Sequence, residues 1–185
     1  MNIARLIIPK LKACVLACMV FSLISAQAAD KIAFQNWAVE LGPETSEAYT
    51  ANDSNSSLGI FCGGATCVFY LNPNLNCQPN TKNAVLMNGS AVSSAINMQC
   101  TLVGQHYFQI LDPFDQVLNE IKAGDNIGFA VALKGGAFSV YRFSLNGAMP
   151  AIQRALDEAA KKSQLRQAQP IIPQAPASGF KDITL

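Results

Sequence analysis

The chain has 185 residues, of which 50% are hydrophobic and 14% charged, and its formal net charge is +1. Nucleic-acid binding depends on clustered lysine and arginine side chains, so this balance argues against a nucleic-acid partner. A chain of this size forms one domain and buries about two thirds of its unfolded surface.

Residues 1–28 have the pattern of a secretory signal peptide. Arg5, Lys10 and Lys12 precede an uncharged, mostly apolar run at 13–25, and Ala-Gln-Ala at 26–28 supplies the cleavage pattern. An uncleaved anchor is the alternative, but the run is shorter than the about 20 residues that span a bilayer. Cleavage leaves 157 residues with a formal charge of −2. We expect a periplasmic or secreted protein without stable membrane insertion.

The first elements of the exported chain are predicted less clearly than the later ones. Residues 32–41 predict a strand or an extended arm in which aromatic residues such as Phe34 and Trp37 are buried. An exposed recognition patch is the alternative for these two side chains, although a single tryptophan in a small β domain usually lies in the core. Residues 42–57 are rich in Glu, Asn and Ser and predict an exposed loop with a short strand at 48–50.

A β-hairpin is predicted in the next stretch. Residues 58–61 and 68–71 are strand-like, and Gly63-Gly64-Ala65-Thr66 lies between them. Such a loop favours a hairpin because glycine accepts the positive φ values that tight turns require. Residues 72–83 hold two prolines and five asparagines and predict a loop. Three further strands are predicted at 84–87, 91–102 and 107–111, with a turn at Asn88-Gly89.

A helix is predicted to follow, with Asp112 as its N-cap and Pro113 in its first position. Gly124 is predicted to end it. One buried face is indicated by apolar residues at i, i+3, i+4 and i+7: Phe114, Val117, Leu118 and Ile121.

The C-terminal part predicts a second hairpin and a second helix. Residues 126–133 and 137–145 alternate around Gly135-Gly136, and Asn146 then begins a helix that runs to about Lys162. We expect a single β-rich domain at 29–162, an antiparallel β-sandwich or partial barrel with one inserted helix and a C-terminal helix. Residues 163–185 are rich in Pro and Gln and predict a disordered tail.

Four cysteines remain after cleavage: Cys62, Cys67, Cys77 and Cys100. An even number in an exported chain predicts two disulfides, with three connectivities possible. The first hairpin places Cys62 opposite Cys67, at a Cα separation of about 4.5–5.5 Å that a disulfide accepts. Cys77 then pairs with Cys100 by elimination. A site of four thiolates for a metal is the alternative, but such sites prefer reducing compartments. We expect no metal or cofactor.

His106 is the only histidine of the chain. A general base needs an orienting partner and a nucleophile, and the nearest candidates in the sequence, Ser94 and Asp112, form no known spacing. We therefore expect His106 to be a surface residue.

The carboxylates predict no catalytic site either. Asp112, Asp115 and Glu120 are explained by helix capping and a solvated helix face, and Glu44 and Glu47 are expected in a loop. A glycosidase-like pair remains the alternative, because such carboxylates meet in space rather than along the chain.

The start of the exported chain, residues 34–39, resembles the Phe-x-x-Trp-x-Val start of the invasion-associated locus B family. Further similarity lies at Cys100-Thr101 with Gly104, at Lys122-Ala123-Gly124 and at residues 143–147. Residues 58–62, the late hairpin and the Phe-x-Leu-x-Gly ending are also similar to periplasmic accessory proteins of type VI secretion. Both resemblances imply an exported β-sandwich of the bacterial envelope.

We expect a non-enzymatic, disulfide-stapled interaction protein that has a protein partner in the envelope or on a host cell and supports invasion or secretion. The alternatives are a small exported hydrolase that uses loop carboxylates, and an accessory protein of a type VI secretion system. A flat apolar patch favours partner binding, whereas a deep cleft with paired carboxylates favours catalysis.

Overall fold

The computed structural model describes residues 30–168 except 74, 91–92, 104 and 134. The predicted signal peptide at 1–28 and the tail beyond residue 168 lie outside the described residues, so both stay predictions.

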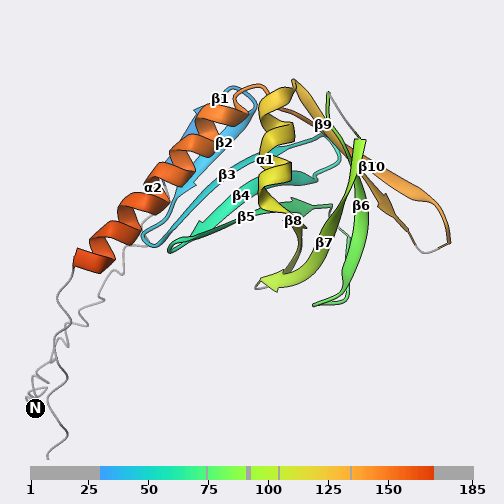
Figure 1. Cartoon of the computed structure of the whole chain (residues 1–185), viewed down its shortest axis with the longest axis horizontal. Coiled ribbons are helices and arrows are strands. Elements are labelled where there is room, and N and C mark those ends of the chain that lie inside the picture. The colour runs from blue at the N-terminus through green and yellow to red at the C-terminus, as the bar shows by residue number, and fades with distance from the viewer. Residues whose placement is uncertain (1–29, 74, 91–92, 104, 134, 169–185) are drawn as a thin grey trace, which may run out of the picture.

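Ten antiparallel strands form one sheet that curls into a half-barrel (Figure 1), which confirms the expected fold class. Along the sheet their order is β1-β2-β3-β4-β5-β8-β7-β6-β9-β10, so β1 and β10 are its two edges. The strands are β1 Asp30–Phe34, β2 Trp37–Leu41, β3 Thr45–Ala51, β4 Ser57–Gly63, β5 Thr66–Asn72, β6 Lys82–Asn88, β7 Ser93–Val103, β8 His106–Asp112, β9 Asn126–Ala132 and β10 Phe138–Ser144.

Two helices cover the inner face of the curled sheet. Helix α1 (Phe114–Ala123) packs against β5, β8 and β9, and helix α2 (Ala148–Ala168) lies along β1 to β4 (Figure 1). Between helices and sheet lies one apolar core, in which Trp37, Phe69 and Phe129 are the largest fully buried side chains. Neither of these two helices is long and apolar enough to cross a membrane.

Strand β3 includes the short strand predicted at 48–50 and corrects the prediction of an exposed loop around it at 42–57. Seven residues of this stretch form the strand, and Ser46, Ala48 and Thr50 are buried beneath α2. Helix α2 presents alanines to the sheet, so its backbone approaches closely enough for the Ser46 hydroxyl to donate to the Ala155 carbonyl at 2.7 Å. Small inward residues do not give the apolar alternation that predicts a strand, and only the position of the helix explains their burial.

The stretch 32–41, predicted as one strand or an extended arm, belongs instead to a hairpin of β1 and β2 with its turn at Gln35 and Asn36. Gln35 adopts a positive φ of 53°, which its residue type does not indicate. The Asn36 amide donates to the Asn146 carbonyl at 3.2 Å, so contact with the segment before α2 holds this turn.

The helix ends also differ from the prediction. Asp112 is not an N-cap: it is the last residue of β8, paired with Asn97, and Pro113 occupies the cap position without a side-chain cap. Helix α1 does end before Gly124, which is extended rather than left-handed.

Helix α2 continues to Ala168, so the prediction of disorder is wrong for residues 163–168. Their good helix formers continue the helix, because the first proline of the tail is Pro170. Arg166 near the end of this helix forms a solvent-exposed ion pair with Glu44 in the loop before β3.

Candidate functional site

The structure contains two disulfides, and they are the pairs expected from the sequence. Cys62 and Cys67 lie directly opposite each other in the β4–β5 hairpin, with a Cα separation of 4.1 Å. Cys77 joins Cys100 at a Cα separation of 6.1 Å and ties the loop before β6 to the middle of β7. No group of three or more His, Cys, Asp or Glu residues in the described part of the chain is arranged to hold a metal ion.

The residues weighed as a histidine-centred site are not brought together. His106 is exposed at the start of β8, whereas Asp112 ends the same strand, about 20 Å away at the usual rise per residue. Ser94 lies on β7 opposite Met87 of β6. His106 is therefore a surface residue without the two partners that a general base needs.

Two glutamates do meet across neighbouring strands. Glu40 of β2 and Glu47 of β3 are direct cross-strand partners, although Glu47 was expected in a loop. The Tyr49 hydroxyl donates to Glu40 at 2.7 Å and accepts from the Lys31 ammonium at 2.7 Å. The Tyr70 hydroxyl donates to Glu47.

These environments shift the pKa values of the two carboxyl groups in opposite directions. The hydrogen bond from Tyr49, with a smaller contribution from Lys31, lowers the pKa of Glu40 below its usual value. Burial raises the pKa of the half-buried Glu47 above its usual value, and the Tyr70 hydrogen bond only partly offsets this effect. Burial and the neighbouring Glu47 also raise the pKa of Tyr70, so its hydroxyl stays protonated and donates.

We expect Glu40→Gln and Glu47→Gln to alter acid stability with opposite signs. A lowered carboxyl pKa stabilises the fold above the usual value near 4.5, and this contribution is lost as the pH falls. A raised pKa has the reverse effect, because the fold binds the proton more tightly and loses stability as the pH rises above 4.5. Relative to wild type, Glu40→Gln should lose stability from pH 3 to pH 7 and Glu47→Gln should gain it. Urea unfolding at both pH values measures this, and shifts of the same sign contradict it.

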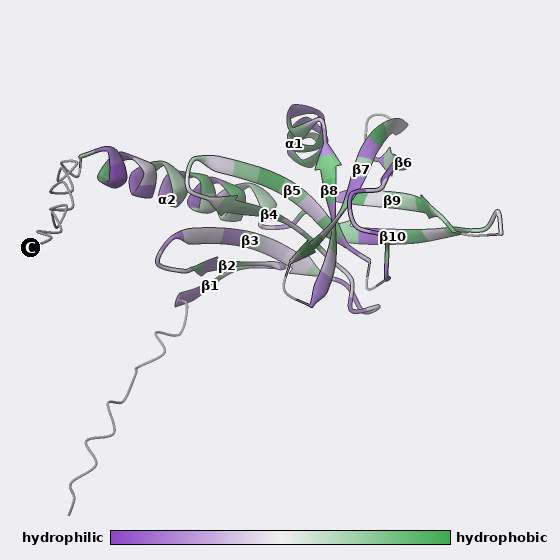
Figure 2. Ribbon diagram, turned by 90° about the horizontal axis from the view of Figure 1, so that it is seen from below, coloured by the Kyte–Doolittle hydropathy of each residue, from purple (hydrophilic) through white to green (hydrophobic). Residues whose placement is uncertain are grey.

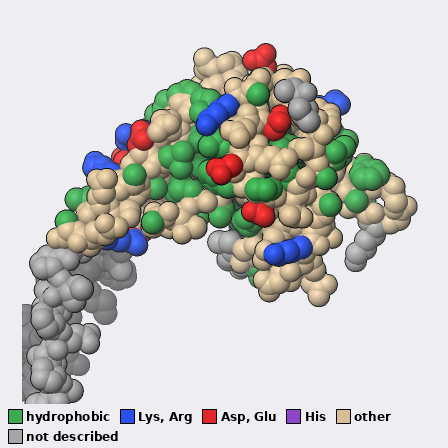
Figure 3. Space-filling model, viewed as in Figure 1, with side chains coloured by type: hydrophobic (Ala, Val, Ile, Leu, Met, Phe, Trp, Pro, Cys, Tyr) green, Lys and Arg blue, Asp and Glu red, His purple; other side chains and the backbone are tan. Residues whose placement is uncertain are grey.

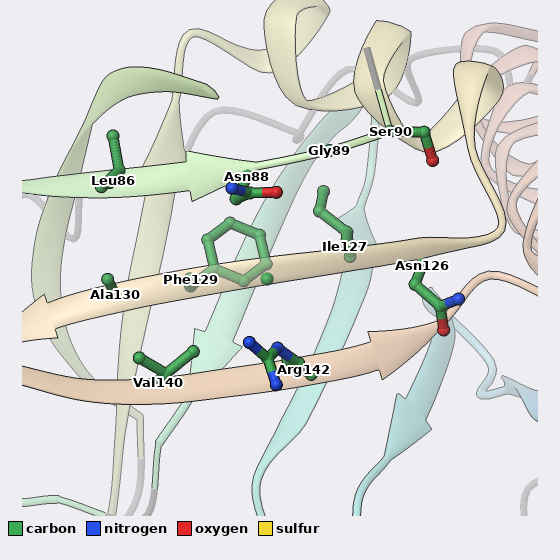
Figure 4. Close-up of a pocket in the computed structure, with 11 residues that line it drawn as sticks. Leu86, Asn88, Gly89, Ser90, Asn126, Ile127, Phe129, Ala130, Val140 and Arg142 are labelled. Carbon is green, nitrogen blue, oxygen red and sulfur yellow. The ribbon is translucent and has the colours of Figure 1, made fainter. Parts of the chain in front are cut away.

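A shallow groove lies on the outer face of β6, β9 and β10 (Figure 4), with a volume of about 390 Å³. Its floor is low because Gly128 has no side chain and Ala130 only a methyl group. Two cross-strand rows form the groove: Leu86, Ala130 and Val140, and Asn88, Gly128 and Arg142.

Strand β10 is an open edge over its first half. The Arg142 carbonyl accepts from the Asn52 side chain at 3.4 Å, and the Ser144 carbonyl accepts from the Trp37 indole at 3.0 Å. Backbone groups two residues apart point the same way, so those of Phe138 and Val140 also point to the edge. In the described part of the molecule these groups have no partner, because β10 pairs only with β9.

The side chains of this open half are apolar and exposed. Phe138 is 66% exposed and Val140 57% exposed. The β9–β10 hairpin projects from the body of the molecule in Figures 1 and 2, and Figure 3 shows hydrophobic side chains gathered on that projection. An unpaired edge strand with exposed apolar side chains can pair with a strand of another chain. Most proteins cover or charge such edges to prevent this pairing.

Sequence reasoning found the hairpin but missed this surface. A signal was present: in β10 both alternate sets include large apolar residues, with Phe138 and Val140 on one face and Tyr141 and Phe143 on the other. Two apolar faces predict a strand covered on both sides, yet only the set facing the core is covered.

These features define a class of fold: a curled antiparallel sheet that two helices cover and two disulfides cross-link. No acidic residue is among the described residues that line the two cavities. No family model and no curated protein matches the chain. A solved structure with this fold is the crystal structure of invasion-associated protein B from Bartonella henselae. It is 15% identical with a TM-score of 0.50, over 70% of this chain and 97% of that one. The similarity agrees with the resemblance in sequence at the level of the fold.

Proposed function

We propose that this protein is an exported, non-enzymatic interaction protein of the bacterial envelope that binds an extended segment of a protein partner at β10. The observation that carries the proposal is the open half of this edge strand, where unpaired backbone groups coincide with the exposed side chains of Phe138 and Val140. Strand addition uses both: backbone hydrogen bonds give affinity, and alternate side chains give specificity.

The chemistry of the edge defines the partner segment. A strand added beside β10 continues the cross-strand rows of the outer face, so apolar residues are favoured opposite Phe138 and Val140. Arg142 in the next row favours an acidic residue. The groove beyond Val140 gives room for a bulky side chain that reaches over the edge.

Export is supported by the two disulfides, which persist in oxidising compartments such as the periplasm or outside the cell. A role in host-cell invasion is the finer proposal, supported by the fold shared with the Bartonella protein. An accessory role in type VI secretion fits the same compartment and the same mode of binding.

A hydrolase is the second candidate, favoured by the cross-strand pair of Glu40 and Glu47. Against it, each carboxylate accepts a tyrosine hydrogen bond, and neither contributes to the groove on β9. Loss of a measured hydrolytic activity in Glu47→Gln would favour this candidate over partner binding.

Val140→Pro is the sharpest test of the proposed interaction. Proline removes the edge-facing N–H of residue 140, whereas the ladder to β9 is unaffected because that N–H makes no bond to it. We expect Val140→Pro to weaken partner binding by at least about tenfold, since strand addition loses one hydrogen bond and its geometry. Val140→Thr is the matched control, because threonine keeps the backbone N–H and suits a strand.

Capture from an envelope extract, compared among the wild type and both variants, identifies the partner, and calorimetry with its isolated segment then measures affinity. A partner that binds Val140→Pro as tightly as Val140→Thr contradicts strand addition at this edge.

A further inference from the structure

A second cavity, which shares no lining residue with the outer-face groove, lies where β6, β7, β8 and β9 meet the loop before β6. Its volume is about 900 Å³, within the range of small-molecule sites. The cross-strand partners Asn83 and Met98 line its wall on β6 and β7, and Val131 lines it on β9. Leu75 and Cys77 cover it from the loop before β6.

Gln109 of β8 also lines this cavity and is 4% exposed. Its Oε1 atom is buried and has no hydrogen-bond partner within the described residues. A buried amide without a partner costs about 1–3 kcal/mol, so a fold retains one most readily where something else completes the bond.

The cavity also has a definite chemical character. Leu75, Met98, Val131 and Leu133 supply apolar surface. Besides Gln109, uncharged polar side chains line it at Asn76, Gln78, Thr81 and Asn83, and none of the described residues that line it carries a charge. Uncharged walls favour an uncharged ligand, because a buried charge without a counter-charge is costly. The disulfide between Cys77 and Cys100 fixes the covering loop to β7, so the cavity is held open in advance of binding.

We propose that this cavity binds an uncharged small molecule with a large apolar part and one hydrogen-bond donor, which donates to the Oε1 atom of Gln109. None of the described residues that line the cavity belongs to β10, so either proposal can fail while the other stands.

N-phenyl-1-naphthylamine is a suitable probe, because it is uncharged and apolar, carries one N–H donor and fluoresces more strongly in apolar surroundings. We expect saturable binding to the wild-type protein. Gln109→Leu should bind it about three- to tenfold more weakly, as expected for the loss of one neutral hydrogen bond. The thermal midpoint of this variant should stay equal or rise, because an unpaired buried amide is replaced by an apolar group of similar size.

A matched probe isolates the hydrogen bond. In 1-benzylnaphthalene a methylene replaces the N–H, so its affinity, measured by competition, should be the same for the wild type and Gln109→Leu. If the variant weakens both probes equally, or weakens neither, the assigned hydrogen bond is wrong.

A pair of neighbouring substitutions locates the site. Asn83→Trp places an exposed tryptophan on the lining of the cavity and should abolish probe binding. Lys82→Trp adds the same side chain one residue earlier on the opposite face of β6, and should leave binding unchanged. Equal effects of the two, or no saturable binding to the wild type, overturn the proposal.

Discussion

Gly147→Ala is expected to lower the free energy of unfolding by at least about 3 kcal/mol. Gly147 precedes α2 with a φ of +88°, and a Cβ atom there would overlap the backbone carbonyl of Phe34 in the β1–β2 hairpin. Backbone at both sides of the contact cannot move as a flexible side chain can, so β1 or α2 must shift. Urea unfolding with a comparison of midpoints and slopes measures the loss.

Gly136→Ala separates the cost of the left-handed backbone conformation from the cost of the overlap with the Phe34 carbonyl. Gly136 has a similar φ of +83°, but nothing lies within 4 Å of its Cβ position. Its substitution therefore carries only the cost of the left-handed conformation, about 1–2 kcal/mol. Equal losses for Gly147→Ala and Gly136→Ala would show that the approach of Phe34 is not what requires glycine at residue 147.

Trp37→Ala is expected to cost about 3–5 kcal/mol, the range for removing a buried aromatic side chain. Trp37 is 1% exposed, and its indole donates to the Ser144 carbonyl at 3.0 Å. The side chain thus joins β2, near one edge of the sheet, to β10 at the other edge. Its loss opens a cavity and also leaves a backbone acceptor unpaired.

Two further variants test that explanation. Trp37→Phe keeps most of the volume but loses the indole donor, so it should cost less than alanine, about 1–3 kcal/mol. Phe138→Ala removes a side chain that is 66% exposed and should change stability by no more than about 0.5 kcal/mol. If Trp37→Ala costs no more than Phe138→Ala, then Trp37 does not join the two edges.

Several parts of this fold follow from local sequence. Glycines between apolar runs predicted the β4–β5 and β9–β10 hairpins, and the facing position of Cys62 and Cys67 followed from the first of them. The apolar periodicity of α1 predicted its buried face, where Val117 and Ile121 are fully buried. Each of these inferences rests on residues close together in the chain, where spacing alone fixes the geometry.

The residues of the candidate sites could not be identified from local sequence, because helix packing and strand register bring them together. Ser46, Ala48 and Thr50 are buried because the alanines of α2 let the helix lie close to β3. Glu40 meets Glu47 only because β2 and β3 pair in one particular register.

The open edge and the second cavity depend on the whole sheet. Whether Phe138 is covered depends on which strand ends the sheet, and whether Gln109 has a partner depends on what surrounds it. The sequence by itself determined the β4–β5 and β9–β10 hairpins and, with Cys62 opposite Cys67, both disulfide pairs, because spacing and local backbone geometry set the turns. It did not determine the β1–β2 hairpin or the full length of β3. The tertiary structure decided burial and exposure, because these depend on contacts between residues as far apart in the chain as Trp37 and Ser144.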